Sequence, residues 1–120
     1  MKFTKGLPRP AQPDELVGID TEFYKMTKPH RADGVFAALT IAYTNGDTYL
    51  ITKQSDIGPA LKRTAKGTWV MQNALFDIRA LRRYVDIPQR YIHDTMLVDM
   101  DLFGGWYSTF SLADLSRRHL

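Results

Sequence analysis

Two carboxylates separated by one residue, Asp20 and Glu22, are the side chains of this sequence that point most directly to chemistry. They lie in residues 17–24, whose odd positions are β-branched or aromatic, as on the buried face of a strand. Because side chains alternate along a strand, both carboxylates project from the same face, roughly 7 Å apart. Hard oxygen ligands of this kind suit Mg²⁺ or Mn²⁺. The pair therefore predicts either a metal site or the polar outer face of a solvated strand.

Three strands are expected to surround this pair and to form an antiparallel unit. The first covers residues 17–24, the second 35–43 and the third 48–52. Residues 44–47, Thr-Asn-Gly-Asp, join the last two strands, and Asn-Gly is the strongest short-range signal of a β-hairpin. The antiparallel unit therefore comes first in the domain.

The rest of the chain is expected to alternate helices with short strands. In order, these elements are a short helix capped by Ser55-Asp56 and ended by Gly67, a buried parallel strand at 68–71, a helix stopped by Pro88, a short strand at 91–93, a helix capped by Asp94-Thr95 and a last helix from Ser111.

A third carboxylate, Asp77, lies in the first turn of the helix that follows the strand at 68–71. Ligands of open α/β sheets gather at the carboxyl ends of the inner strands. If the strands at 17–24 and 68–71 are neighbours, Asp20, Glu22 and Asp77 converge.

Two motifs resemble those of the DEDD family of 3′→5′ exonucleases. Ile19-Asp20-Thr21-Glu22 is similar to the first motif of the family, and residues 72–77, Gln-Asn-Ala-Leu-Phe-Asp, are similar to the second. Residues 92–97 and 111–115 resemble further stretches of the proofreading domain of bacterial DNA polymerase I. The resemblance extends from about residue 16 to the end of the chain.

The resemblance implies an α/β fold of the ribonuclease H-like kind, with a mixed sheet of three antiparallel strands followed by parallel strands and flanking helices. Residues 1–15, which are rich in proline, are expected to form a flexible arm. Residues 16–120 are then expected to form the exonuclease-like domain, incomplete at its carboxyl end.

The activity implied by the resemblance is two-metal hydrolysis of phosphodiester bonds. Asp20 would bridge both Mg²⁺ or Mn²⁺ ions, and Glu22 and Asp77 would each hold or orient one side. Two such ions activate a water and stabilise the leaving 3′ oxygen. The substrate would be the 3′ end of single-stranded DNA, with RNA left open, and a polymerase domain is the partner that the resemblance suggests.

Further residues are candidates for contact with the substrate. The set grouped with the carboxylates is Thr21, Tyr24, Asn73 and Phe76. Tyr24 and Phe76 have aromatic faces on which bases stack, although Phe76 equally fits the core. Asn73 either orients the terminal nucleotide or caps the helix that follows it.

The polar segment after Tyr24 carries Lys25, Lys28 and Arg31. These cations either meet backbone phosphates or belong to an ordinary solvated loop.

One motif of the family has no counterpart. Its third motif, a Tyr or His followed four residues later by the fourth catalytic Asp, does not occur after His93, and Asp94 is expected to be a helix cap. Either a partner chain supplies this motif, or the chain is a catalytically impaired module that binds nucleic acid or protein.

Composition sets the remaining bounds. The 120 residues include no cysteine, so disulfides and thiolate metal sites are excluded, and the net charge of +3 permits a polyanionic partner without requiring one. The sequence shows neither a signal peptide nor a run long enough to span a membrane, so we expect a soluble cytoplasmic protein.

Overall fold

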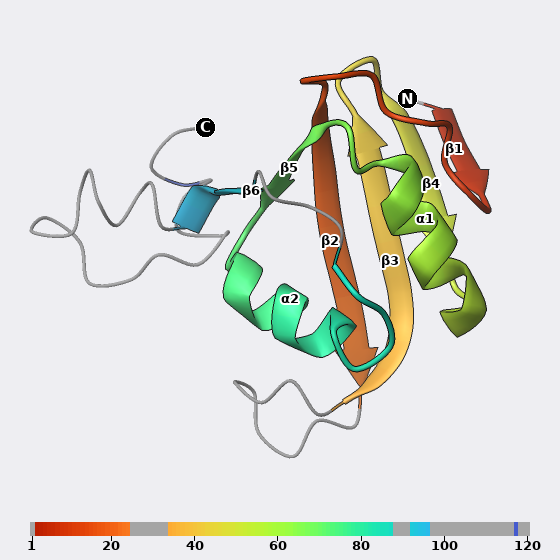
Figure 1. Ribbon diagram of the computed structural model, residues 1–120, viewed down its shortest axis with the longest axis vertical. Coiled ribbons are helices and arrows are strands. Elements are labelled where there is room, and N and C mark those ends of the chain that lie inside the picture. Colours follow the sequence, from red (N-terminus) through yellow and green to blue (C-terminus); the bar gives the residue numbers. More distant parts are fainter. Residues whose placement is uncertain (1, 25–33, 88–91, 97–116, 118–120) are drawn as a thin grey trace, which may run out of the picture.

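The centre of the fold is a pair of long antiparallel strands, β2 (Leu16–Tyr24) and β3 (Val35–Tyr43), in the computed structural model (Figure 1). The structure describes residues 2–24, 34–87, 92–96 and 117. Strand β4 (Asp47–Ile51) follows β3 through a tight turn in which the Gly46 amide donates to the Tyr43 carbonyl (3.0 Å). The antiparallel unit expected from the sequence, with its Asn-Gly hairpin, is therefore confirmed.

The parallel part of the sheet lies on the other side of β2. Strand β5 (Thr68–Met71) runs parallel to β2, and β6 (Ile92–Asp94) runs parallel to β5. The six strands are arranged in the order β1-β4-β3-β2-β5-β6. The two strands that carry or precede the candidate carboxylates are thus direct neighbours, as their convergence requires.

Two α-helices cover one face of the sheet (Figure 1). A short 3-10 helix, η1 (Gln54–Asp56), leads into α1 (Ile57–Arg63), and α2 (Ala74–Leu81) follows β5. Asp56 is the N-cap residue immediately before α1, but its side chain makes no capping hydrogen bond. Both helices are shorter than the sequence suggests. The helix expected from Ser111, and most of the one expected after Asp94-Thr95, lie outside the described residues.

A single hydrophobic core fills the space between the helices and the sheet. The odd-numbered side chains of β2 point into it, whereas Asp20 and Glu22 point away and are exposed. The largest fully buried core side chains are Trp69, Leu39, Ile41, Ile51, Ile57, Leu61, Met71 and Leu81. No helix within the described residues is long and apolar enough to cross a membrane.

The amino-terminal segment differs from the flexible arm that its prolines suggest. Residues Lys2–Lys5 form β1, which pairs in parallel with β4 at the edge of the sheet. The guanidinium of Arg9 lies 3.9 Å from the centre of the Tyr43 ring, and its Nη2 lies 2.7 Å from the Glu15 carboxylate. That pair holds the pKa of Glu15 down at about 2. Backbone pairing and this ionic contact, neither of which leaves a local sequence signal, fix residues 2–15 against the domain.

The backbone at Gly67 lies very close to the segment at Glu15–Val17. A Cβ added there would be 2.6 Å from the Glu15 carbonyl oxygen and 2.8 Å from Cγ2 of Val17. The neighbouring Thr68 amide donates to the same carbonyl (2.8 Å), so this contact also sets the register at which β5 begins.

We therefore predict that Gly67→Ala lowers the free energy of unfolding by about 2–3 kcal/mol, because the backbone at Glu15 must move. Urea denaturation followed by circular dichroism measures the change. Gly58→Ala is the matched control, since its added Cβ would meet only a side-chain carbon of Val85 at 3.3 Å. Equal urea midpoints for Gly67→Ala and the unmodified protein would contradict the prediction.

Candidate active site

The candidate site lies at an open edge of β2. Strand β5 pairs with β2 only along Leu16–Gly18, so among the described residues no strand pairs with the second half of β2 on that side. After β5 the chain turns at Asn73, whose φ of 56° lies in the left-handed region that asparagine tolerates, and enters α2. Helix α2 therefore lies beside the part of β2 that carries Asp20 and Glu22 (Figure 1).

Asp77 contacts β2 directly across this edge. Its side chain is 6% exposed, and Oγ1 of the buried Thr21 donates a hydrogen bond to its Oδ1. The sequence groups Thr21 with residues that contact the substrate, but the structure commits its hydroxyl to Asp77. This bond places the helix carboxylate next to the residue that separates Asp20 from Glu22.

The charges of Asp20 and Glu22 act on the buried Asp77. Burial raises the pKa of Asp77 from its ordinary value of 3.8 to about 6, the hydrogen bond from Thr21 opposes this rise, and the negative charges of Asp20 and Glu22 add to it. Because like charges disfavour the ionised form, a cation in this region would relieve the repulsion. This is the electrostatic condition that a site for a hard divalent cation needs.

The metal-ligand geometry is less complete than the charge pattern. Within the described part of the chain, no three His, Cys, Asp or Glu side chains are placed so as to hold a metal ion together. The donor chemistry does fit Mg²⁺ or Mn²⁺, because Asp20, Glu22 and Asp77 offer only carboxylate oxygens. The fold brings the two elements together, and Asp77 responds to the charge of the strand pair.

Asn73 is the N-cap residue immediately before α2, but its side chain makes no capping hydrogen bond. Asp94 at the end of β6 takes that role instead: its carboxylate accepts hydrogen bonds from the amides of Asn73 (3.1 Å) and Ala74 (2.7 Å). Asp94 also accepts from the Met96 amide (2.9 Å), in agreement with the cap expected from the sequence. No local signal reveals its second role, since its partners lie about twenty residues earlier in the chain.

The aromatic candidates have different environments. Phe23 packs against the core beside Phe36 and Tyr84, with ring centres 6.0 and 6.5 Å away. Tyr24, at the end of β2, is 48% exposed, and Phe76 in α2 is half-buried. Tyr24 is therefore the most exposed of these three candidate aromatic residues.

Some candidates cannot be placed. Lys25, Lys28 and Arg31, expected to meet phosphates, lie outside the described residues.

An exposed apolar residue that sequence reasoning missed is Leu75, which is 60% exposed at the start of α2.

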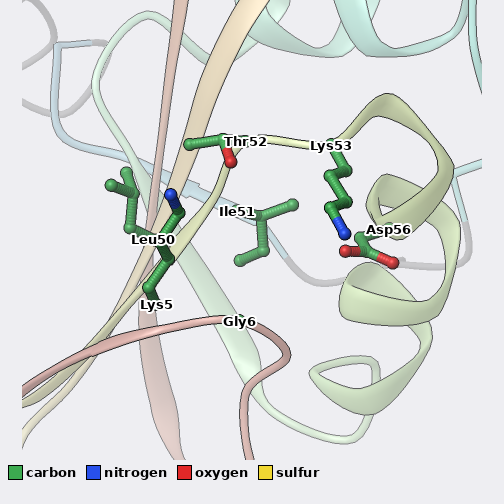
Figure 2. A pocket seen from close by; sticks show the side chains of 7 residues that line it. All are labelled: Lys5, Gly6, Leu50, Ile51, Thr52, Lys53 and Asp56. Carbon is green, nitrogen blue, oxygen red and sulfur yellow. The ribbon is translucent and has the colours of Figure 1, made fainter.

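A cavity of about 330 Å³ lies elsewhere, at the ends of β1 and β4 (Figure 2). Its lining residues are Lys5, Gly6, Leu50, Ile51, Thr52, Lys53 and Asp56. Strand β3 separates β4 from β2, and none of the three candidate carboxylates lines this cavity. The cavity is therefore not part of the candidate active site.

Comparison with solved structures identifies the fold. Brucella melitensis NrnC matches 99% of this chain with a TM-score of 0.73 at 15% sequence identity, and the same protein with bound Mg²⁺ matches 98% with a TM-score of 0.72 at 14% identity. A third structure, Brucella melitensis NrnC bound to pGG, matches 99% at a TM-score of 0.73 and 15% identity. The chain spans about 60% of the length of these proteins. The α/β fold of the ribonuclease H-like kind is thereby confirmed.

Sequence comparison adds no relative. No protein-family model matches the chain, and no curated protein matches it.

The buried Asp77 should make the stability of the protein depend on pH in a defined direction. Because its folded pKa is raised, the contribution of Asp77 to stability is fully present below pH 3.8 and is lost as the pH rises through about 6. Asp77→Asn removes this loss and keeps an oxygen that can accept from Thr21. We predict that between pH 4 and pH 7.5 the stability difference shifts in favour of Asp77→Asn by about 1–2 kcal/mol.

Urea denaturation at a series of pH values, in the presence of a chelator, measures this shift. Asp86→Asn is the control, because it makes the same substitution at an exposed residue after α2. If the stability difference between Asp77→Asn and the unmodified protein stayed constant across the series, burial would not be disfavouring the ionised form of Asp77.

Proposed function

We propose that this protein is a metal-dependent nuclease that hydrolyses phosphodiester bonds in short single-stranded nucleic acids. The observation that carries the proposal is the buried Asp77, which Thr21 joins to the strand that bears Asp20 and Glu22. Carboxylates whose ionised form is disfavoured by burial and by neighbouring charges, as in Asp77, cluster at functional sites. The likeness of the fold to NrnC supports the same class.

The residues proposed to hold the metal are Asp20, Glu22 and Asp77. Magnesium is the favoured ion, since a structure of NrnC contains bound Mg²⁺, and Mn²⁺ has the same preference for carboxylate oxygens. When bound, such ions supply an activated water and stabilise the leaving oxygen, and two ions are the arrangement that the DEDD resemblance implies. Thr21 acts here by holding Asp77.

The proposed direction of cleavage is from the 3′ end, as the DEDD resemblance implies. NrnC has been solved with pGG, a short nucleic acid, which supports a short substrate. The exposed ring of Tyr24 would stack on a base, and the side chain of Asn73, which does not cap its helix, would orient the terminal nucleotide. Phe76 completes the proposed contacts.

The narrower role of proofreading, with DNA as substrate and a polymerase as partner, rests on the sequence resemblance alone. A cytoplasmic location, expected from the sequence, belongs to the same proposal. The loop cations Lys25, Lys28 and Arg31 are proposed to meet the substrate backbone. Experiments that offer DNA and RNA side by side separate these versions of the function.

One pair of observations favours a second candidate, a module that binds nucleic acid without cleaving it. The described residues include no ready group of three metal ligands, and the sequence after His93 has no Tyr or His followed four residues later by Asp. This module would bind single strands and leave them intact.

The metal site is tested first by binding. Manganese titration, followed by calorimetry and by paramagnetic broadening of amide resonances, should reveal a site near β2 and the start of α2. Asp20→Ala should abolish binding, because the proposed bridging ligand is lost, whereas Asp86→Ala should leave it unchanged. Equal manganese affinity in Asp20→Ala and the unmodified protein would remove these carboxylates from the proposal.

Cleavage is tested with 5′-labelled single-stranded DNA and RNA of two to ten nucleotides in the presence of Mg²⁺. We predict slow, stepwise shortening from the 3′ end, abolished by Asp77→Ala. A partner segment that carries Tyr-x-x-x-Asp should raise the rate by about a hundredfold, because the rate depends strongly on how the water is aligned. Binding without cleavage, even with that segment present, would support the binding module instead.

A further inference from the structure

The start of α2 has no cap of its own. The first amides of any helix lack partners within the helix, and a side chain just before it usually satisfies one of them. In α2 that position is Asn73, whose side chain makes no such bond. The two oxygens of Asp94, buried at the end of β6, each accept from one of the amides of Asn73 and Ala74.

A second side chain fixes the same turn. The hydroxyl of Thr95 donates to Oε1 of Gln72 (2.6 Å), and β6 also pairs with β5 through Met71 and Asp94. Residues 94–95 therefore hold the turn at 72–74 by side-chain bonds in addition to the sheet. We call this contact the β6 clamp.

The β6 clamp is linked to the candidate site through α2. Asp77 lies three residues after Ala74, within the same first turn of the helix, so the position of Ala74 sets the position of Asp77. Thr21 holds the Asp77 side chain from β2, and the β6 clamp holds the helix from β6. Together these two contacts fix both the carboxylate and the backbone that carries it.

Asp94 is well suited to this role, because a carboxylate is among the side chains that best satisfy the amides at the start of a helix. Its own oxygens already accept from three amides, those of Asn73, Ala74 and Met96, so it is poorly suited to bind a metal directly.

We propose that Asp94 is a positioning residue of the candidate active site: through the β6 clamp it fixes the start of α2, and with it Asp77, which would hold the metal, and Asn73, which would orient the terminal nucleotide. This inference rests on the proposed nuclease function. It assigns Asp94 a role in the site without direct contact to metal or substrate.

The test compares Asp94→Asn and Asp94→Ala with the control Asp56→Asn. Asp56 is the N-cap residue immediately before α1, but unlike Asp94 its side chain makes no capping hydrogen bond. Three readouts are needed: hydrogen exchange of the Asn73 and Ala74 amides, the Mn²⁺ dissociation constant, and kcat and KM for a short oligonucleotide.

We expect both Asp94 variants to lose protection at the two amides while the core strands stay protected. Affinity for Mn²⁺ should fall by about tenfold to a hundredfold, as for other residues that orient metal ligands, and kcat should fall with it. Asp94→Asn keeps one acceptor oxygen and should be the milder variant, whereas Asp56→Asn should change none of the three readouts.

The outcomes separate this inference from the function on which it rests. If the unmodified protein fails to bind Mn²⁺, the proposed function is wrong and the positioning role falls with it. If it binds Mn²⁺ and the Asp94 variants bind equally well despite unprotected amides, the β6 clamp does not position the site. Should both variants unfold, Thr95→Val, which removes the hydrogen bonds of the Thr95 hydroxyl to Gln72 and to the Met71 carbonyl, replaces them under the same criteria.

Discussion

The hydrogen bond from Thr21 to Asp77 is the contact on which the candidate site depends. It joins residues 56 positions apart in the chain and connects the central strand β2 to the helix that follows β5. The bond is possible because β5 pairs with β2 only as far as Gly18, which leaves the following residues of β2 open to α2. A longer β5 would put a strand between these two side chains and separate the helix carboxylate from the strand pair.

The amino-terminal segment and the candidate site differ in whether their carboxylates are paired with a cationic side chain. Glu15 is paired with Arg9, and its pKa is lowered to about 2, which stabilises the amino-terminal segment. Among the described residues, Asp20, Glu22 and Asp77 have no such ion pair, and the pKa of Asp77 is raised instead. Carboxylates with perturbed pKa values cluster at functional sites, which is why this difference marks Asp77 as a candidate.

The candidate residues come from one half of the sheet. Strands β2, β5 and β6 are consecutive in the sheet order, and α2 connects β5 to the segment that leads to β6. The opposite half, with β1 and β4, holds the cavity lined by two lysines and contributes none of the carboxylates. A likeness of fold at 15% identity does not by itself transfer a function, so the functional argument depends on this half of the sheet.

Local order was readable from the sequence because alternation and turn chemistry act between neighbouring residues. It determined the strand at Thr68–Met71, the Asn-Gly hairpin, the shared face of Asp20 and Glu22, and the place of Asp77 in the first helical turn. The tertiary structure alone decided that Thr21 holds Asp77, that Asp94 caps α2, and that residues 2–5 join the sheet. These contacts depend on which strands are neighbours and on where β5 ends, and no pattern among adjacent residues encodes either of them.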